Sequence, residues 1–106
     1  MKEDIKLSNQ DGILVARILG DIDHHSAKHM REKIDLSLFE VKPTALVIDF
    51  SLVDFMDSSG LGLILGRVEK ASALGIPVYV SGMNKGLHRL AKLAGLEKLK
   101  NLTLTK

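Results

Sequence analysis

The sequence contains no cysteine and no tryptophan, and three phenylalanines and one tyrosine are its only aromatic residues. A chain without cysteine has no disulfide framework, no thiolate metal site and no thiol nucleophile, and it suits a reducing compartment. No stretch reaches the roughly 18 uncharged apolar residues that span a bilayer, and the N-terminal residues lack the apolar segment of an export signal. We therefore expect a cytoplasmic protein that does not contact membranes.

An excess of charge of one sign is also missing. Fifteen Lys and Arg residues against 13 Asp and Glu residues leave a formal net charge of +2, too little to argue for nucleic acid binding. The distribution is uneven, because residues 43–66 contain no Lys or Arg, whereas residues 82–106 contain six of them and a single Glu. The basic segment has no interleaved aromatic side chains, so we interpret it as a solvated surface and expect no nucleic acid partner.

The length of the chain predicts one domain over residues 1–106, and its first elements predict a hairpin. A weak strand at residues 5–7 and an apolar, β-branched strand at residues 13–19 flank a turn at residues 9–12. Asp23 then caps a helix over residues 24–40, whose apolar residues recur at spacings of three and four. The expected buried face of this helix consists of Ala27, Met30, Ile34 and Leu38.

Strands and helices alternate in the rest of the chain. Residues 44–50 form a nearly continuous apolar run, which predicts a central strand covered on both faces. A helix is expected at residues 58–74, a strand at 78–80, a helix at 85–94 and a short strand at 102–104. This order predicts an α/β sandwich in which helices pack on a mixed β-sheet that begins with the hairpin. The expected apolar faces of the two later helices are Leu61, Ile64, Leu65 and Val68, and Leu87, Leu90, Ala91 and Ala94.

The helix predicted at residues 58–74 has three glycines in its interior, Gly60, Gly62 and Gly66. A glycine within a helix costs about 1 kcal/mol relative to alanine, so three of them need a compensating reason. We expect this helix to approach neighbouring backbone or a partner molecule closely.

Histidines are the first candidate metal ligands. His25 and His29 are four residues apart and would share a helix face, with His24 beside them. No HExxH-type glutamate lies between them, and polar residues at a helix start are usually solvated or capping. We therefore predict surface histidines and no metal.

Five aspartates are the second group of candidate functional residues. Four of them follow apolar strands and could converge at one end of the sheet. Such a cluster could hold Mg²⁺ or supply an aspartate that accepts a phosphoryl group. The ordinary alternative is that Asp23 and Asp57 cap helices while the others lie in loops. The five residues are Asp21, Asp23, Asp49, Asp54 and Asp57.

The segment DFMDSSGLG, from Asp54 to Gly62, lies between the central strand and the glycine-rich helix. Ser58 or Ser59 has an ordinary role there as a helix cap. The functional alternative is phosphorylation, because a phosphate at a helix N-terminus meets free N–H groups and the positive end of the helix dipole. The residues alone leave both interpretations open.

Two enzyme motifs do not match this segment. D-S-S-G is not the G-x-S-x-G of a hydrolase, and no histidine is clearly placed as a base, although spacing alone leaves His88 open. The glycines lack the G-x-G-x-x-G spacing, and no P-loop lysine follows them. Neither a hydrolase triad nor a dinucleotide site is predicted.

Three segments of the chain together resemble a known family. They are GDIDHH at residues 20–25, LVIDF at 46–50 and FMDSSGLGLILGR at 55–67. Over nearly its whole length the chain resembles the STAS domain of anti-sigma factor antagonists, and among these it is most similar to antagonists of the anti-sigma F factor of sporulating bacteria. The GDIDHH loop and the FMDSSG segment are two separated motifs in the right order, and together they make this resemblance more specific than D-S-S-G alone.

The resemblance implies a STAS-like fold and a partner-switching protein with no enzymatic activity and no cofactor of its own. In the family, the unphosphorylated antagonist binds an anti-sigma factor that is also a serine kinase using ATP, and this frees the sigma factor to direct transcription. Phosphorylation of the first serine after the motif's aspartate ends the binding, and a PP2C-type phosphatase restores it.

Carried to this chain, the resemblance implies Ser58 as the phosphate acceptor, with Ser59 as the fallback. The protein alone is expected to be monomeric. Because Asp21, Asp23, Asp54 and Asp57 make the expected surface acidic, a docked partner should present basic residues or a metal-bound adenine nucleotide. The expected partner-binding residues are Asp21, Asp23, Asp57, Ser59, Gly60, Leu61 and Gly62.

Two other functions stay open. One is a STAS scaffold or sensor that binds a protein or a small ligand without serine phosphorylation. The other is a receiver or a metal-dependent phosphatase that uses Asp54 or Asp57. A receiver would need an acidic pair after its first strand and a lysine after its last, and residues 78–82 contain no lysine.

Overall fold

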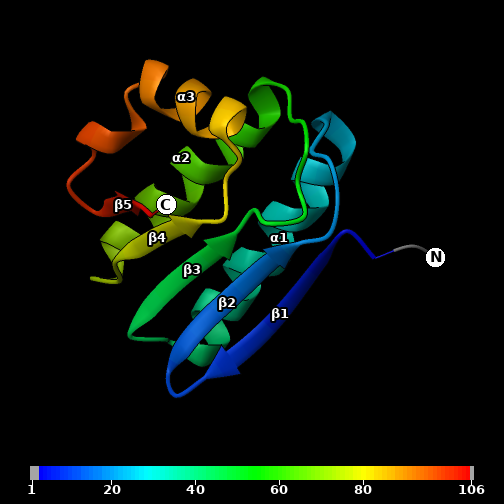
Figure 1. The fold of residues 1–106 in the computed structure, drawn as a ribbon. Helices are drawn as coiled ribbons and strands as arrows, with labels where there is room; N and C mark the ends of the chain where they lie inside the picture. The colour runs from blue at the N-terminus through cyan, green and yellow to red at the C-terminus, as the bar shows by residue number, and fades with distance from the viewer. Residues whose placement is uncertain (1–2, 106) are drawn as a thin grey trace.

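Helices and strands alternate after an opening hairpin, as the apolar pattern predicted (Figure 1). The computed structural model describes residues 3–105. Only the short 3-10 helix η1 was not predicted. The elements are β1 (Ile5–Gln10), β2 (Ile13–Ile18), α1 (His24–Val41), β3 (Ala45–Asp49), α2 (Ser58–Ala73), β4 (Val78–Ser81), α3 (Lys85–Leu93), η1 (Leu96–Lys98) and β5 (Leu102–Leu104).

The five strands form one mixed sheet with the order β1-β2-β3-β4-β5. β1 and β2 are antiparallel, and the remaining neighbours are parallel. Asp11 and Gly12 turn the hairpin with positive φ angles of 53° and 84°, which suit the tight connections that hairpins favour. β3 is the middle strand, as predicted.

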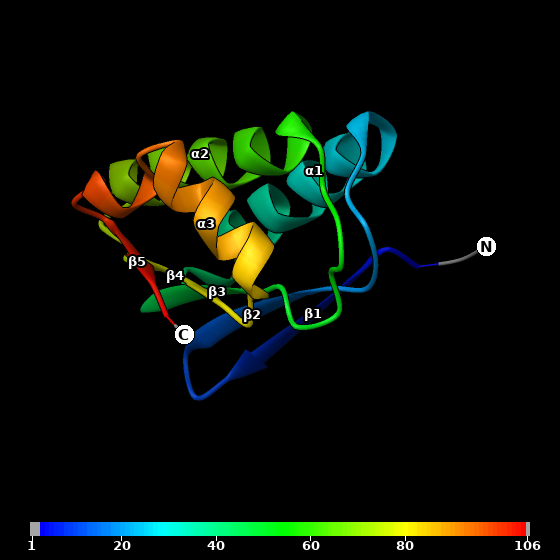
Figure 2. The ribbon, with the colours of Figure 1, turned by 45° about the horizontal axis from the view of Figure 1, so that its top comes forward.

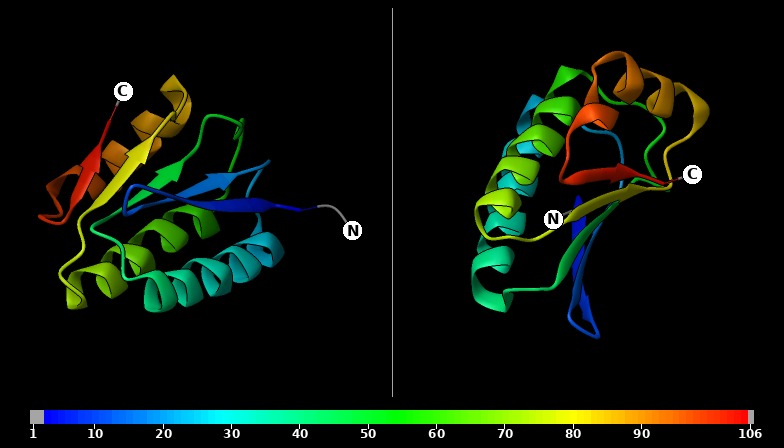
Figure 3. Two further views of the ribbon diagram at one scale, coloured as in Figure 1. Left: turned by 90° about the horizontal axis from the view of Figure 1, so that it is seen from below. Right: turned by 90° about the vertical axis from the view of Figure 1, so that its left-hand side faces the viewer.

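The helices lie on one face of the sheet (Figures 2 and 3). Successive crossovers move across the sheet in one direction, and because such crossovers are right-handed, each places its helix on the same side. The prediction that the central strand is covered on both faces was therefore wrong. On the open face, Val15, Val47 and Tyr79 stand in register on adjacent strands, and this cross-strand row accounts for the apolar run.

The covered face of the sheet and the inner faces of the helices share one hydrophobic core. The prediction for α2 was partly wrong, because Leu65 is 39% exposed while Leu63 is buried. The prediction for α3 was also partly wrong, because Leu90 and the C-cap residue Ala94 are exposed, while Leu87 and Ala91 face the core. The core includes Leu14, Ile18, Leu46, Ile48, Val78 and Val80 from the sheet, and Met30, Ile34, Leu38, Leu63, Ile64, Val68, Leu87 and Ala91 from the helices.

Arg67 of α2 is the buried charge among residues 3–105, with 3% of its surface exposed. Its Nε lies 2.8 Å from Asp35 Oδ1 of α1, close enough for an ion pair, but the contact is not aligned as a hydrogen bond. Burial lowers the pKa of Arg67, Asp35 opposes this, and the charge of Arg31 lowers the pKa further. The pair joins the two helices whose first turns carry the predicted site.

Removal of either partner of this pair should have unequal effects. Asp35→Ala leaves a buried, uncompensated guanidinium and is expected to lower the free energy of unfolding by about 3 kcal/mol. Arg67→Met should lower it less, because Asp35 is 24% exposed and keeps contact with water. Arg17→Met is the matched control: the Arg17 side chain, 53% exposed, pairs with Asp49, and its loss should cost less than about 1 kcal/mol. Urea unfolding measures all three, and equal losses for Asp35→Ala and Arg17→Met would contradict the argument.

Candidate functional site

Three loops meet at the carboxyl edge of the sheet. β2, β3 and β4 are parallel, so the segments that follow them leave the sheet at the same edge, where α/β sheets commonly bind their ligands. The segments are residues 19–23, 50–57 and 82–84. The first two run side by side to the first turns of α1 and α2, as Figures 1 and 2 show.

Backbone pairing joins the first two loops. Ile22 and Met56 form a parallel bridge, in which the Ile22 N–H donates to Phe55 O and the Asp57 N–H donates to Ile22 O, each at 3.3 Å. Asp21 Oδ1 accepts from the N–H groups of Asp54 and Phe55 at 3.1 and 3.0 Å. The bridge ends one residue before each helix cap, so it holds the two helix starts next to each other.

The third loop is joined to the second by Asn84 and Gly82. Asn84 Nδ2 donates to Asp54 O at 3.2 Å, while Asn84 Oδ1 caps α3 by accepting from the Leu87 N–H at 2.8 Å. Gly82 has a φ of +76°, and a Cβ there would lie 2.7 Å from the Ser51 nitrogen. Neither residue was predicted from the sequence, although a Gly followed two residues later by a residue that can cap a helix was a visible signal.

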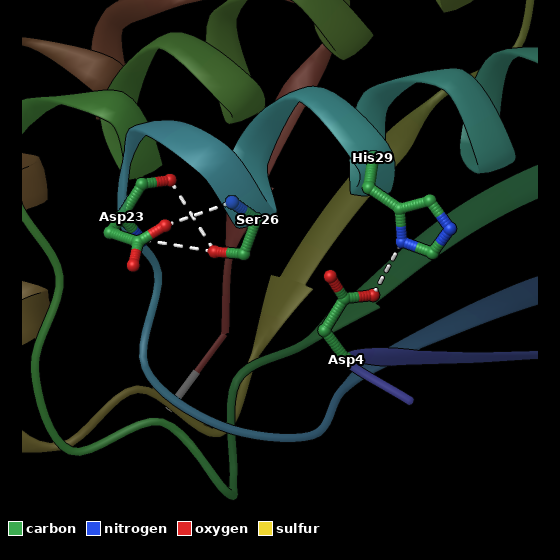
Figure 4. Close-up of polar contacts among 4 residues, drawn as sticks. All are labelled: Asp4, Asp23, Ser26 and His29. Atoms are coloured by element: carbon green, nitrogen blue, oxygen red, sulfur yellow. Dashed lines mark hydrogen bonds and ion pairs between the residues drawn. The ribbon is translucent and has the colours of Figure 1, made fainter. Parts of the chain in front are cut away.

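Asp23 and Asp57 cap the two adjacent helices, which confirms the ordinary interpretation of these aspartates. Asp23 Oδ1 accepts from the Ser26 N–H at 2.8 Å, and Ser26 Oγ accepts from the Asp23 N–H at 3.0 Å, forming a capping box (Figure 4). Asp57 Oδ1 accepts from the Ser59 N–H at 2.8 Å. Since the aspartate caps α2, neither Ser58 nor Ser59 is needed for this purpose.

The two serines differ in exposure. Ser58 is the first residue of α2 and is exposed, whereas Ser59 is half-buried. Asp21, Asp23, Asp54 and Asp57 are likewise exposed. The structure thus brings the predicted acceptor serine and the aspartates of both sequence motifs into one surface.

The glycines of α2 have different roles. Gly60 is buried, and a Cβ there would meet Met56 side-chain atoms at less than 3 Å, so this glycine admits Met56. Gly62 is exposed and Gly66 half-buried, and a Cβ at either would have no neighbour within 4 Å. The expected close approach of this helix to a neighbouring segment is therefore found at Gly60, where Met56 packs against the helix. A contact of Gly60 with a partner protein stays a prediction. Leu61 is half-buried against the core.

The charge around the serines is mixed rather than purely acidic, which corrects the sequence-based expectation. A groove beside Ser59 and Gly62 is lined from α1 by three basic residues, His24, Lys28 and Arg31. The expectation failed because the segment without Lys or Arg ends up beside a helix that precedes it in the chain.

The histidines and aspartates of this region are not arranged as a metal site. His29 Nδ1 lies 2.8 Å from Asp4 Oδ1 and donates to it when protonated there, so the pair ties the first described residues to α1 (Figure 4). His24 and His25 lie edge to face, with ring centroids 6.0 Å apart. Within residues 3–105, no group of three or more His, Asp or Glu side chains is placed to hold a metal ion.

Over the same range, no helix combines the length and apolar character needed to cross a membrane.

Two carboxyl groups have lowered pKa values. Hydrogen bonding from the Ser26 N–H lowers the pKa of Asp23. For Asp49, burial alone would raise the pKa, but hydrogen bonds from Ser51 and the contact with Arg17 outweigh burial, and the pKa is lowered. Both groups therefore stabilise the fold above the ordinary aspartate pKa of 3.8, and this stabilisation is lost as the pH falls through their lower values.

We expect Gly60→Ala and Gly62→Ala to shift stability in opposite directions. The Gly60→Ala methyl would collide with Met56, so a loss of about 1–3 kcal/mol in the free energy of unfolding is expected. Gly62→Ala adds a methyl in open space and should raise stability by up to about 1 kcal/mol. Urea unfolding measures both variants, and adding Met56→Ala to Gly60→Ala should give a less than additive loss. A stabilised Gly60→Ala protein would refute this packing role.

Acid should destabilise the protein partly through the Asp23 cap. Asp23→Asn keeps an oxygen acceptor for the Ser26 N–H but removes the ionisation, so its unfolding free energy should fall less steeply below about pH 4 than that of the wild type. Urea unfolding between about pH 3 and 6 tests this. Identical slopes for the wild type and Asp23→Asn would contradict it.

Comparison with known proteins places the chain in a family. Residues 4–106 match the model of the STAS domain. The anti-sigma F factor antagonist of Paenibacillus polymyxa is 33% identical over 99 residues, which are 93% of this chain and 85% of that protein. The solved structure of an anti-sigma factor antagonist from Mycobacterium paratuberculosis is 30% identical, with a TM-score of 0.77, over 92% of this chain and 82% of that one.

A second solved structure has the same fold. The Bacillus cell fate determinant SpoIIAA in the phosphorylated form is 26% identical, with a TM-score of 0.74, over 96% of this chain and 91% of that one. The fold, the order of the two sequence motifs and the similarity to these relatives all indicate the same family. This chain belongs to the STAS-domain family and, within it, to the anti-sigma factor antagonists.

Proposed function

We propose that the protein works as a partner switch that controls a sigma factor. In its unphosphorylated form it binds an anti-sigma factor, which is also a serine kinase carrying an adenine nucleotide, and the sigma factor is released. Transfer of a phosphate to Ser58 ends the binding, and a PP2C-type phosphatase reverses it. The role is regulatory rather than catalytic, it belongs in the cytoplasm, and its relatives are named for the same antagonism.

The observation that carries this proposal is the position of Ser58. It is exposed, it begins α2, and the cap of that helix is supplied by the neighbouring Asp57. A kinase can therefore reach the hydroxyl without unfolding the helix or removing its cap. SpoIIAA, a relative solved in a phosphorylated form, supports a phosphate in this family.

A phosphate on Ser58 changes the surface by charge. It adds about −1.5 to −2 charges at pH 7, beside the exposed carboxylates of Asp23 and Asp57. A partner that docks on this surface would have to bury that charge, and an imperfectly paired buried charge costs several kcal/mol. The affinity should therefore fall by orders of magnitude while the fold is kept.

The surrounding structure favours a local effect over a refolding switch. The loops around Ser58 are held by the Ile22–Met56 bridge and by Asp21, and neither of these joins uses the Ser58 side chain. The helix N-terminus also interacts favourably with a negative group. The added phosphate thus meets no contact that it must break.

The rest of the predicted partner surface has a consistent geometry. Asp21 and Asp23 come from the loop before α1, while Asp57, Ser59, Gly60, Leu61 and Gly62 come from the cap and the start of α2. Gly62 lacks a side chain, so a partner can approach the helix backbone closely there. We propose that these residues contact the anti-sigma factor.

Charge reversal at Ser58 tests the switch. Ser58→Asp should weaken binding to the anti-sigma factor of the same organism at least tenfold, because it places a negative group in the contact. Ser72→Asp is the matched control, since Ser72 is exposed near the other end of α2 and makes the same charge change. Isothermal titration calorimetry with the purified partner measures both. Equal affinity of Ser58→Asp and the wild type would sink the proposed switch.

The acceptor is identified by intact mass after incubation with the partner and ATP. The wild type should gain the mass of one phosphate, and Ser58→Ala should gain none. A phosphate on Ser59 in the Ser58→Ala variant would move the site to Ser59. Binding without any phosphate transfer would favour the scaffold or sensor alternative.

A further inference from the structure

A basic groove lies between the first turns of α1 and α2. It has a volume of about 340 Å³ and is lined by His24, Ala27, Lys28 and Arg31 from α1 and by Ser59, Gly62 and Leu63 from α2. The three basic residues follow one another at spacings of four and three, so they share one face of α1. Gly62 adds no side chain on the opposite wall, which leaves the groove open.

The positive charge of this groove is not neutralised by the residues around it. Its lining contains no carboxylate, and none of its three basic residues has an ion-pair partner within residues 3–105. The nearby carboxylates of Asp23 and Asp57 accept hydrogen bonds from the Ser26 and Ser59 N–H groups instead. The groove therefore favours an anion.

A buried arginine lies deeper between the two helices. Arg67 lies one helical turn beyond Leu63, and its buried Nη1 has no hydrogen-bond partner among the described residues. The charge of Arg31 acts on Arg67, and Asp35 is the carboxylate paired with it. Asp35 thus pairs with Arg67 and not with Arg31, and Arg31 has no ion-pair partner within residues 3–105, so it is available to bind a further negative group.

We propose that Lys28 and Arg31 bind the phosphoryl group carried by Ser58, so that the phosphorylated protein closes this groove with an internal ion pair. Ser59 lines the groove, and Ser58 is its immediate neighbour in the chain. Lys28 and Arg31 are both exposed and have long side chains, and the planar guanidinium fits two phosphate oxygens at once. This inference rests on Ser58 as the acceptor in the proposed function.

The consequence for the switch is that one phosphate alters two parts of the surface. It adds negative charge at the start of α2, and it withdraws two positive charges of α1 from any partner. The unphosphorylated protein presents Lys28 and Arg31 freely beside Gly62, and the phosphorylated protein does not.

The test uses protein with phosphoserine placed at position 58 by genetic encoding, so neither a kinase nor a partner is needed. Phosphorus-31 NMR follows the second ionisation of the phosphate, whose pKa is ordinarily about 6. Nearby cations favour the dianion, so this pKa should be about 0.5 lower in the otherwise wild-type protein than in Lys28→Ala/Arg31→Ala. Comparison between the two removes the contribution of the helix N-terminus, which both share.

Lys33→Ala/Arg89→Ala is the matched control, because it removes the same number of exposed cations that do not line the groove. It should leave the phosphate pKa unchanged, and about 0.5 M NaCl should narrow the difference made by Lys28→Ala/Arg31→Ala. A phosphate pKa that is the same with and without Lys28 and Arg31 overturns the internal ion pair. That result would leave the partner switch intact, since the switch is measured separately by the binding of Ser58→Asp.

Discussion

The structure around Ser58 depends on one constraint, the backbone bridge between Ile22 and Met56. It joins loops that are more than 30 residues apart, and it ends immediately before the caps of α1 and α2. The Asp21 carboxylate strengthens the join by accepting from two backbone N–H groups of the second loop. Because both helix starts are held by the same few hydrogen bonds, residues of the two sequence motifs form a single surface.

The direction in which the chain crosses the sheet explains why α1 and α2 are neighbours at this surface. Right-handed crossovers that all move the same way place α1 and α2 side by side on one face. Arg67 and Asp35 hold the two helices together within that layer. The same geometry leaves the opposite face of the sheet without a helix from residues 3–105, and Val15, Val47 and Tyr79 stand in register on adjacent strands there.

Neighbouring residues at the start of α2 have different structural roles, and these roles determine what the site can do. Asp57 caps α2, which leaves the Ser58 hydroxyl in solvent. Gly60 accommodates Met56 inside the fold, whereas Gly62 opens the surface. A serine so placed can gain or lose a phosphate while the hydrogen bonds that position it stay intact. This arrangement suits a protein that is controlled by a single reversible modification.

The sequence by itself determined the order and type of the elements, the cap at Asp23, the candidate serines and the family, because these depend on local spacing and short motifs. Only the tertiary structure decided that Leu63 rather than Leu65 enters the core, that Leu90 and Ala94 are exposed, and that the sheet has one open face. It also decided that Lys28 and Arg31 lie beside Ser59, so that the acidic appearance of the segment was misleading. These features depend on contacts between residues far apart in the chain, and such contacts leave no periodic signal in the sequence.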